Sequence, residues 1–163
     1  AAILALLLPG GIGVSVLAAF DGPETPAKSA KAKHVFPAGC ERADSVAALG
    51  HLKNARILAP FDMTPMILMT TPHQVLASSH HRNEVAMHDH IATFIAPPDE
   101  ARVLLRKRGI THIAACMDEA ELKFYAKRNP YGLWAHLAAG KTPFFLEQMT
   151  PLGKGIQVWR VRF

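Results

Sequence analysis

The chain has 163 residues, enough for one domain of ordinary size with an accessory segment, and half of the residues are hydrophobic, which is ample for a packed core. Its formal net charge of +5 would suit a nucleic-acid partner, but the basic residues are dispersed and no nucleic-acid-binding motif is present. The run "RKR" at 106–108 fits the end of a helix, where the helix dipole favours cations. No nucleic-acid partner is therefore expected.

The first twenty residues, "AAILALLLPGGIGVSVLAAF", contain no ionisable side chain, whereas all eighteen Lys and Arg residues lie later in the chain. Twenty helical residues span about 30 Å, the thickness of a hydrocarbon core, so we expect residues 1–20 to form one membrane-spanning helix. A secretory signal peptide, with Val16 and Ala18 before a cleavage site, and a buried core helix stay open as alternatives. Because the chain lacks an initiator Met, we expect it to continue upstream.

Residues 21–39 mix Pro, Gly, Ala, Ser and Lys without hydrophobic periodicity, which is the composition of a linker. The folded domain is therefore expected to begin at residue 40. Lys28, Lys31 and Lys33 in the linker fit attraction to anionic lipid head groups, with simple solvation as the alternative. By the positive-inside rule, these lysines would favour a cytoplasmic domain.

The two cysteines favour the opposite compartment. Cys40 opens the expected domain and Cys116 ends a predicted strand, so they are candidates for one disulfide that closes a long loop. Such a bridge makes sense in an oxidising compartment. Two buried free cysteines remain the alternative.

Residues 40–163 alternate extended and helical patterns. Strands are expected near 56–59, 74–77 and 110–115, because these short apolar runs are bounded by turn-forming residues. Since helical material separates them, crossover connections should make these strands mainly parallel. The closing pieces "PFFLEQM" and "IQVWRVRF" predict an antiparallel hairpin. The expected fold class is α/β, with a small, mainly parallel or mixed sheet and covering helices, preceded by one hydrophobic helix.

Two helices carry specific predictions. In "DMTPMILMTT", Thr64 is expected as the N-cap and Pro65 as the first helical residue. In "APPDEARVLLRKRG", acidic residues precede basic ones, Leu104 and Leu105 should face the core, and Gly109 should end the helix. The residues expected in the core with these two leucines are Ile57, Leu58, Val75, Leu76, Ile113 and Ala114.

The stretch "TTPHQVLASSHHRNEVAMHDH", residues 70–90, holds five of the nine histidines. Metal binding needs three or four converging donors, commonly spaced as His-x-x-x-His, and this spacing does not supply them, so no metal site is expected. No nucleophile in a recognisable setting accompanies the histidines, so neither a catalytic residue nor a cofactor is expected.

Within this stretch, the loop "HHRN" follows a predicted buried strand, and the carboxyl ends of strands in α/β sheets carry ligand-binding loops. His80, His81, Arg82 and Asn83 are therefore the candidate binding residues. Arg82 and Asn83 are expected either to hold the turn through side-chain hydrogen bonds or to meet an anionic group such as a lipid phosphate.

The succession "ARILAPFDMTPMILMTTPHQVLASSHHRN", "PPDEARVLLRKRGITHIAAC" and the terminal "IQVWRVRF" resembles the C-terminal extracytoplasmic domain of bacterial polytopic membrane proteins related to GT-C glycosyltransferases. The likeness spans residues 40–163. In that family a "YHRN"-like turn recurs, and His80 stands where the family pattern often has an aromatic residue. Family catalysis uses acidic residues in loops between membrane helices, which lie outside this sequence. The Trp-Trp-Asp-type motif of the related oligosaccharyltransferases does not occur here either.

The resemblance implies a domain on the periplasmic side of the bacterial inner membrane. Its expected role is structural or acceptor-positioning, with no catalysis of its own, and its expected partners are the lipid membrane and, through the parent protein, a lipid-linked sugar or an anionic ligand. The alternative is an exported module that binds a small anion through its "HHRN" loop. Membrane helices upstream would support the first interpretation, and an initiator Met with a basic segment the second.

Overall fold

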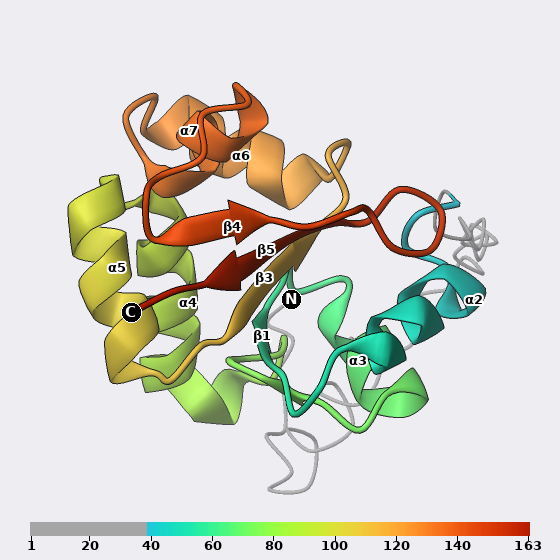
Figure 1. Ribbon diagram of the computed structural model, residues 1–163. Helices are drawn as coiled ribbons and strands as arrows, with labels where there is room; N and C mark the ends of the chain where they lie inside the picture. The colour runs from blue at the N-terminus through green and yellow to red at the C-terminus, as the bar shows by residue number, and fades with distance from the viewer. Residues whose placement is uncertain (1–38) are drawn as a thin grey trace, which may run out of the picture. The chain divides into compact units, whose positions relative to one another are not determined.

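The computed structural model describes residues 39–163, which form a five-stranded mixed sheet with helices on both faces (Figure 1). The expected membrane helix, residues 1–20, and all but the last residue of the expected linker lie outside the described residues. Within residues 39–163, no helix is long and apolar enough to cross a membrane. The strands are β1 (Arg56–Leu58), β2 (Gln74–Val75), β3 (His112–Ala115), β4 (Leu146–Gln148) and β5 (Gln157–Val161).

The strand order is β2-β1-β3-β5-β4. β1 pairs in parallel with both β2 and β3, so that Ile57 lies opposite Val75, and Leu58 opposite Ile113. This confirms the prediction that these three strands share one sheet and run parallel. β5 pairs antiparallel with β3 and with β4, and Ile113 lies opposite Trp159. The antiparallel C-terminal hairpin is therefore confirmed as well, and β4 and β2 are the two edge strands.

Eight helical elements surround this sheet in the described part of the chain. They are α2 (Ala43–Val46), η1 (Ala47–His51), α3 (Thr64–Thr70), η2 (His81–Asn83), α4 (Glu84–Ile95), α5 (Pro98–Lys107), α6 (Ala120–Arg128) and α7 (Leu133–Ala138).

The sequence did not predict α4, although at twelve residues it is the longest of these helices. Its buried residues include Asp89, His90 and Thr93, so the face that packs inward is partly polar. A helix with such a face lacks the apolar repeat by which a helix is recognised in a sequence.

Successive side chains of a strand point to opposite faces of the sheet. The core is therefore divided into two layers, one on each face. Leu58, Ile113 and Trp159 belong to the layer that α4, α5, α6 and α7 cover. Their strand neighbours Ile57, Ala114 and Val158 belong to the layer beneath α2, η1 and α3. The sheet is therefore buried on both faces, as its parallel strands β1, β2 and β3 require.

The predicted core residues are buried with three exceptions. Val75 and Leu76 are half-buried because β2 lies at an edge of the sheet. On α5, Leu105 is fully buried and Leu104 is half-buried. The predicted inward face of α5 is therefore correct, with Leu104 at its margin.

The ends of the predicted helices differ in one respect from expectation. Gly109 has φ 61° just after α5, as its role in ending that helix requires. The prediction that Thr64 is the N-cap and Pro65 the first helical residue is wrong by one position, because Met63 is the N-cap, Thr64 is the first residue of α3 and Pro65 is the second. The hydroxyl of Thr64 instead donates a hydrogen bond of 2.8 Å to the carbonyl of Phe61, so it supports the preceding turn.

Candidate functional site

The "HHRN" loop follows β2 and returns toward the start of β1. Residues 81–83 form the short η2 helix, and Asn83 lines a surface depression with Arg56 and Arg108. Arg56 begins β1, and Arg108 precedes β3 by four residues. Val75 and Leu76, at the carboxyl end of β2, line the same depression, so Asn83 lies beside that end of β2 as well as the amino ends of β1 and β3.

The individual residues of this loop differ in their surroundings. His80 and Arg82 are exposed, and the side chain of His81 lies outside what the structure describes. Asn83 is the N-cap residue of α4, yet its side chain makes no capping hydrogen bond. The expectations that Arg82 and Asn83 fix the turn through side-chain hydrogen bonds or meet an anionic group remain predictions.

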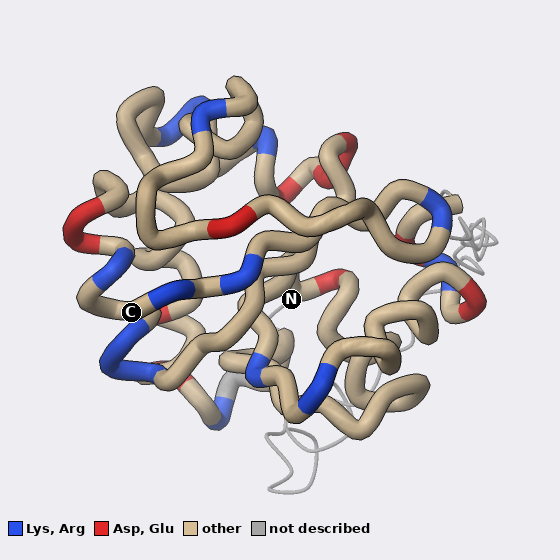
Figure 2. The backbone as a smooth tube through the Cα atoms, in the orientation of Figure 1, with Lys and Arg blue, Asp and Glu red and all other residues tan. Residues whose placement is uncertain are grey.

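The depression beside Asn83 is basic. It measures about 390 Å³, and Arg56, Lys107 and Arg108 contribute to its wall. Figure 2 shows Lys and Arg residues gathered around the end of α5 and along β5, near the C-terminus. Asp89 offsets part of this charge, because its carboxylate lies 2.7 Å from Nε of Arg108 and 3.3 Å from Nζ of Lys107. The depression therefore keeps a net positive charge, which attracts anions.

The histidines of residues 70–90 do not share one site in the described structure. His73 is buried, and its Nε2 lies 2.9 Å from the carbonyl oxygen of Leu49. His88 is exposed, with Nδ1 3.2 Å from the carboxylate of Asp89. His90 is fully buried and stacks on Phe61, with the ring centroids 3.9 Å apart. These three histidines therefore serve separate structural contacts.

The carboxyl ends of β1 and β3 carry acidic residues instead. Glu121, at the start of α6, accepts a hydrogen bond of 2.7 Å from the backbone N–H of Phe61, which follows β1. The hydroxyl of Tyr125 donates to Glu121 Oε1 at 2.7 Å, and Nε2 of His90 lies 3.4 Å from the same oxygen. Burial, together with the hydrogen bond to Glu121, raises the pKa of Tyr125. This network joins β1, α4 and α6.

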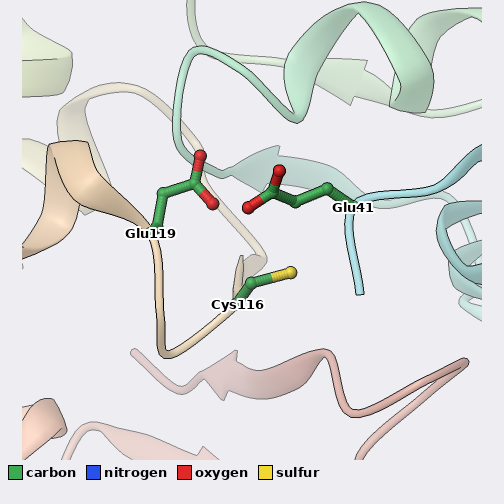
Figure 3. Close-up of side chains that lie close together, drawn as sticks. All are labelled: Glu41, Cys116 and Glu119. Atoms are coloured by element: carbon green, nitrogen blue, oxygen red, sulfur yellow. The ribbon is translucent and has the colours of Figure 1, made fainter. Parts of the chain in front are cut away.

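A disulfide lies beside this network and joins Cys40 to Cys116, with the Cα atoms 6.0 Å apart across 76 positions of sequence. That Cα separation is within the range that a disulfide requires. The bond fixes the start of the described domain to the carboxyl end of β3. It also brings Glu41 next to Glu119, which is three residues beyond Cys116 (Figure 3).

Glu41 and Glu119 form an unusual pair of carboxyl groups. Glu119 is 3% exposed, and its Oε2 has no hydrogen-bond partner among the described residues. The pKa of Glu119 is raised to about 9 by burial first, then by the hydrogen bond with Glu41 and by the charges of Glu41, Asp62 and Glu121. Among the described residues, the one group of donors close enough to share a metal ion is Glu41, Cys116 and Glu119, without a histidine.

Glu41, Glu119 and Glu121 were not among the residues predicted from the sequence. A signal for the first two was present, because Glu41 follows Cys40 directly and Glu119 lies three positions after Cys116. If those cysteines pair, the two acidic residues must come close. The run "DEAE" in which Glu119 and Glu121 lie instead suggested only the favourable charge order of a helix start.

No family model matches this sequence, and no curated protein matches it. Among solved structures, the chain is similar to the C-terminal globular domain of an oligosaccharyltransferase from Archaeoglobus fulgidus, with a TM-score of 0.55 and 11% sequence identity. The likeness covers 74% of this chain and 94% of that one. It is a likeness of fold. Oligosaccharyltransferases are among the relatives that the sequence resemblance implies, although this one comes from an archaeon and the resemblance pointed to bacteria.

Proposed function

We propose that residues 40–163 are the extracytoplasmic C-terminal domain of a glycosyltransferase-like membrane protein, with a structural or acceptor-positioning role. The observation that carries this proposal is the likeness to the C-terminal globular domain of an oligosaccharyltransferase, which extends over 94% of that domain. The Cys40–Cys116 disulfide supports an oxidising compartment. The uncharged segment 1–20 supplies a stretch of the length needed to anchor the domain.

The contacts of the two His–carboxylate pairs favour a structural role. Asp89, beside His88, is occupied by Arg108 and Lys107. Glu121, beside His90, accepts hydrogen bonds from Tyr125 and from the backbone of Phe61. A general base must be able to reach a substrate proton, and these carboxylates already hold helices and loops together. We therefore assign catalysis to other parts of the parent protein.

The basic side of the domain fits a membrane neighbour. Arg56, Lys107 and Arg108 gather at the amino ends of β1 and β3, and the exposed Arg82 precedes Asn83 at the edge of the same depression. Each Lys or Arg close to an anionic leaflet contributes about 1 kcal/mol of attraction. In this proposal, that side of the domain faces lipid head groups or the phosphate of a lipid-linked sugar.

Reporter fusions test the proposed location. Alkaline phosphatase, which needs disulfides to be active, is fused after Phe163 of the full chain, and a parallel fusion carries a fluorescent protein that folds only in the cytoplasm. The proposal predicts phosphatase activity and no fluorescence in a bacterial host. A matched fusion of residues 39–163 alone should lose the phosphatase activity. Bright fluorescence with an inactive phosphatase on the full chain would contradict the proposal.

The depression beside Asn83 favours a second candidate function, binding of a small anion by an exported module. Besides Arg56 and Lys107, the amino end of α4 faces this region, and no side chain caps it. Free backbone N–H groups at a helix start attract anions. Calorimetric titration with inorganic phosphate should detect binding that Arg56→Ala weakens at least tenfold and that Lys141→Ala leaves unchanged. Equal binding by the two variants would exclude this site.

A further inference from the structure

The Glu41–Glu119 pair is the strongest feature that the proposed function leaves unexplained. Glu41 follows Cys40 and Glu119 lies three positions after Cys116, and Figure 3 shows their carboxylates pointing toward each other. One oxygen of each carboxylate and Sγ of Cys116 all lie within 4.8 Å of one another. The backbone N–H of Glu119 donates to the carbonyl of Cys116 at 3.3 Å, which holds Glu119 against the disulfide.

Buried acidic groups need a compensating charge or a proton, because removing an ionised carboxylate from water is costly. Within residues 39–163, no Lys or Arg forms a salt bridge with Glu41, Glu119 or Asp62. Glu119 is 3% exposed, and its Oε2 has no hydrogen-bond partner among the described residues. A buried carboxyl group that keeps one oxygen unpartnered and points at a second carboxyl group is an arrangement that a bound cation would complete.

We propose that Glu41 and Glu119 bind one divalent cation of the hard, oxygen-preferring type, with Ca²⁺ as the best fit. Cys116 supplies no thiolate, because its sulfur belongs to the disulfide, so soft metals lose their preferred ligand. Two carboxylates offer up to four oxygens, and water completes the six to eight that Ca²⁺ takes in a flexible geometry. Asp62, exposed on the loop after β1, adds negative charge nearby.

The disulfide is part of this site, because it is the bond that carries Glu41 to Glu119. Without the Cys40–Cys116 bond, Glu41 would be held only by the local contacts of its own segment. Cation binding and disulfide formation should therefore reinforce each other, since each brings the start of the domain to the end of β3. The cation would stabilise the junction between the start of the described domain and the end of β3, independently of whether the parent protein transfers sugars.

Calorimetry on the full chain tests the site. The protein is purified in detergent, treated with EDTA, and titrated with CaCl₂ and then with MgCl₂. We expect one Ca²⁺ site with a dissociation constant on the order of 10⁻⁴ to 10⁻³ M, the range of extracellular calcium modules. Glu119→Gln, which keeps the shape of the side chain, should weaken binding at least tenfold. Asp118→Asn, next to it and fully exposed, should leave binding unchanged.

Thermal unfolding provides a second measurement, which does not depend on a variant that could misfold. Thermal unfolding of the wild-type chain should shift to higher temperature with Ca²⁺ and return when EDTA is added. Glu41→Gln, at a half-buried position, should remove that shift while the circular dichroism spectrum stays the same. If the wild-type chain binds neither cation at about 10 mM, well above the range of calcium modules, the proposal is overturned and the pair holds a proton instead. Unchanged binding by both glutamine variants would overturn it equally.

Discussion

The carboxylate of Asp89 and the guanidinium of Arg108 are joined by a hydrogen bond of 2.7 Å, which ties the buried face of α4 to the end of α5. Burial by itself raises the pKa of Asp89, but hydrogen bonds from Arg108, His88 and Lys107 outweigh it and bring the pKa to about 2. Because this is below the ordinary value of 3.8, the ionised carboxylate stabilises the folded state above about pH 4.

This contribution should disappear as the pH falls from about 4 through about 2, as Asp89 becomes protonated in the folded state. Asp89→Asn should cost about 2 kcal/mol of unfolding free energy at pH 7 and should flatten the acid side of the stability profile. Urea unfolding at several pH values measures both effects. Asp118→Asn, whose ion pair with Lys123 is exposed, is the matched control and should change stability by less than about 0.5 kcal/mol. Parallel profiles for the two variants would refute the assignment.

A second prediction concerns the contact between α4 and α7. A Cβ atom at Gly132 would lie 2.5 Å from the carbonyl oxygen of Ile95, and Leu133 next to it donates its N–H to Ala96 at 2.7 Å. The atoms nearest to this Cβ belong to the backbone of Ile95 and Asn129, so no flexible side chain can move aside. Gly132→Ala should therefore destabilise the domain by about 2 kcal/mol, as overpacking does. Gly50→Ala, where no atom lies within 4 Å, should be nearly neutral, and equal melting temperatures for both variants would contradict the packing described.

The third prediction isolates one hydrogen bond of the Glu121 network. Tyr125→Phe removes the donor that reaches Glu121 at 2.7 Å and leaves the buried ring in place. Stability should fall by about 1–2 kcal/mol, because the hydrogen bond goes to a charged acceptor. Tyr131→Phe, at a ring that is 76% exposed, provides the control and should be neutral. Chemical denaturation of the two variants measures their free energies of unfolding. An equally large loss of stability in Tyr131→Phe would show that the effect does not come from the hydrogen bond to Glu121.

The sheet and the helices α3 and α5 could be predicted because their signals are local. Apolar runs bounded by turn residues predicted β1, β2 and β3, and charge order with Gly109 predicted α5. The prediction failed for α4, where the buried Asp89 and His90 contact Arg108 and Glu121, residues far away in the sequence. Such compensation depends on the tertiary structure, so no window of sequence shows it.

The candidate sites were harder to predict for a related reason. Asn83 lies near Arg56 only because the chain turns back after β2, and the parallel-sheet rule about carboxyl ends does not foresee that return. Glu41 and Glu119 lie together only because of the disulfide. The sequence suggested the pairing of the cysteines, but it did not suggest that their acidic neighbours would share a buried position.

The redox state of Cys40 and Cys116 in living cells tests the proposed extracytoplasmic location most directly. Cells that produce the full chain are quenched in acid, and free thiols are labelled with a polyethylene-glycol maleimide before and after reduction. The account predicts no labelling before reduction and two labels afterwards, with single labels on the Cys40→Ser and Cys116→Ser variants without reductant. The disulfide should also contribute about 2–4 kcal/mol to stability. Two labels on the wild-type chain before any reductant is added would contradict the account.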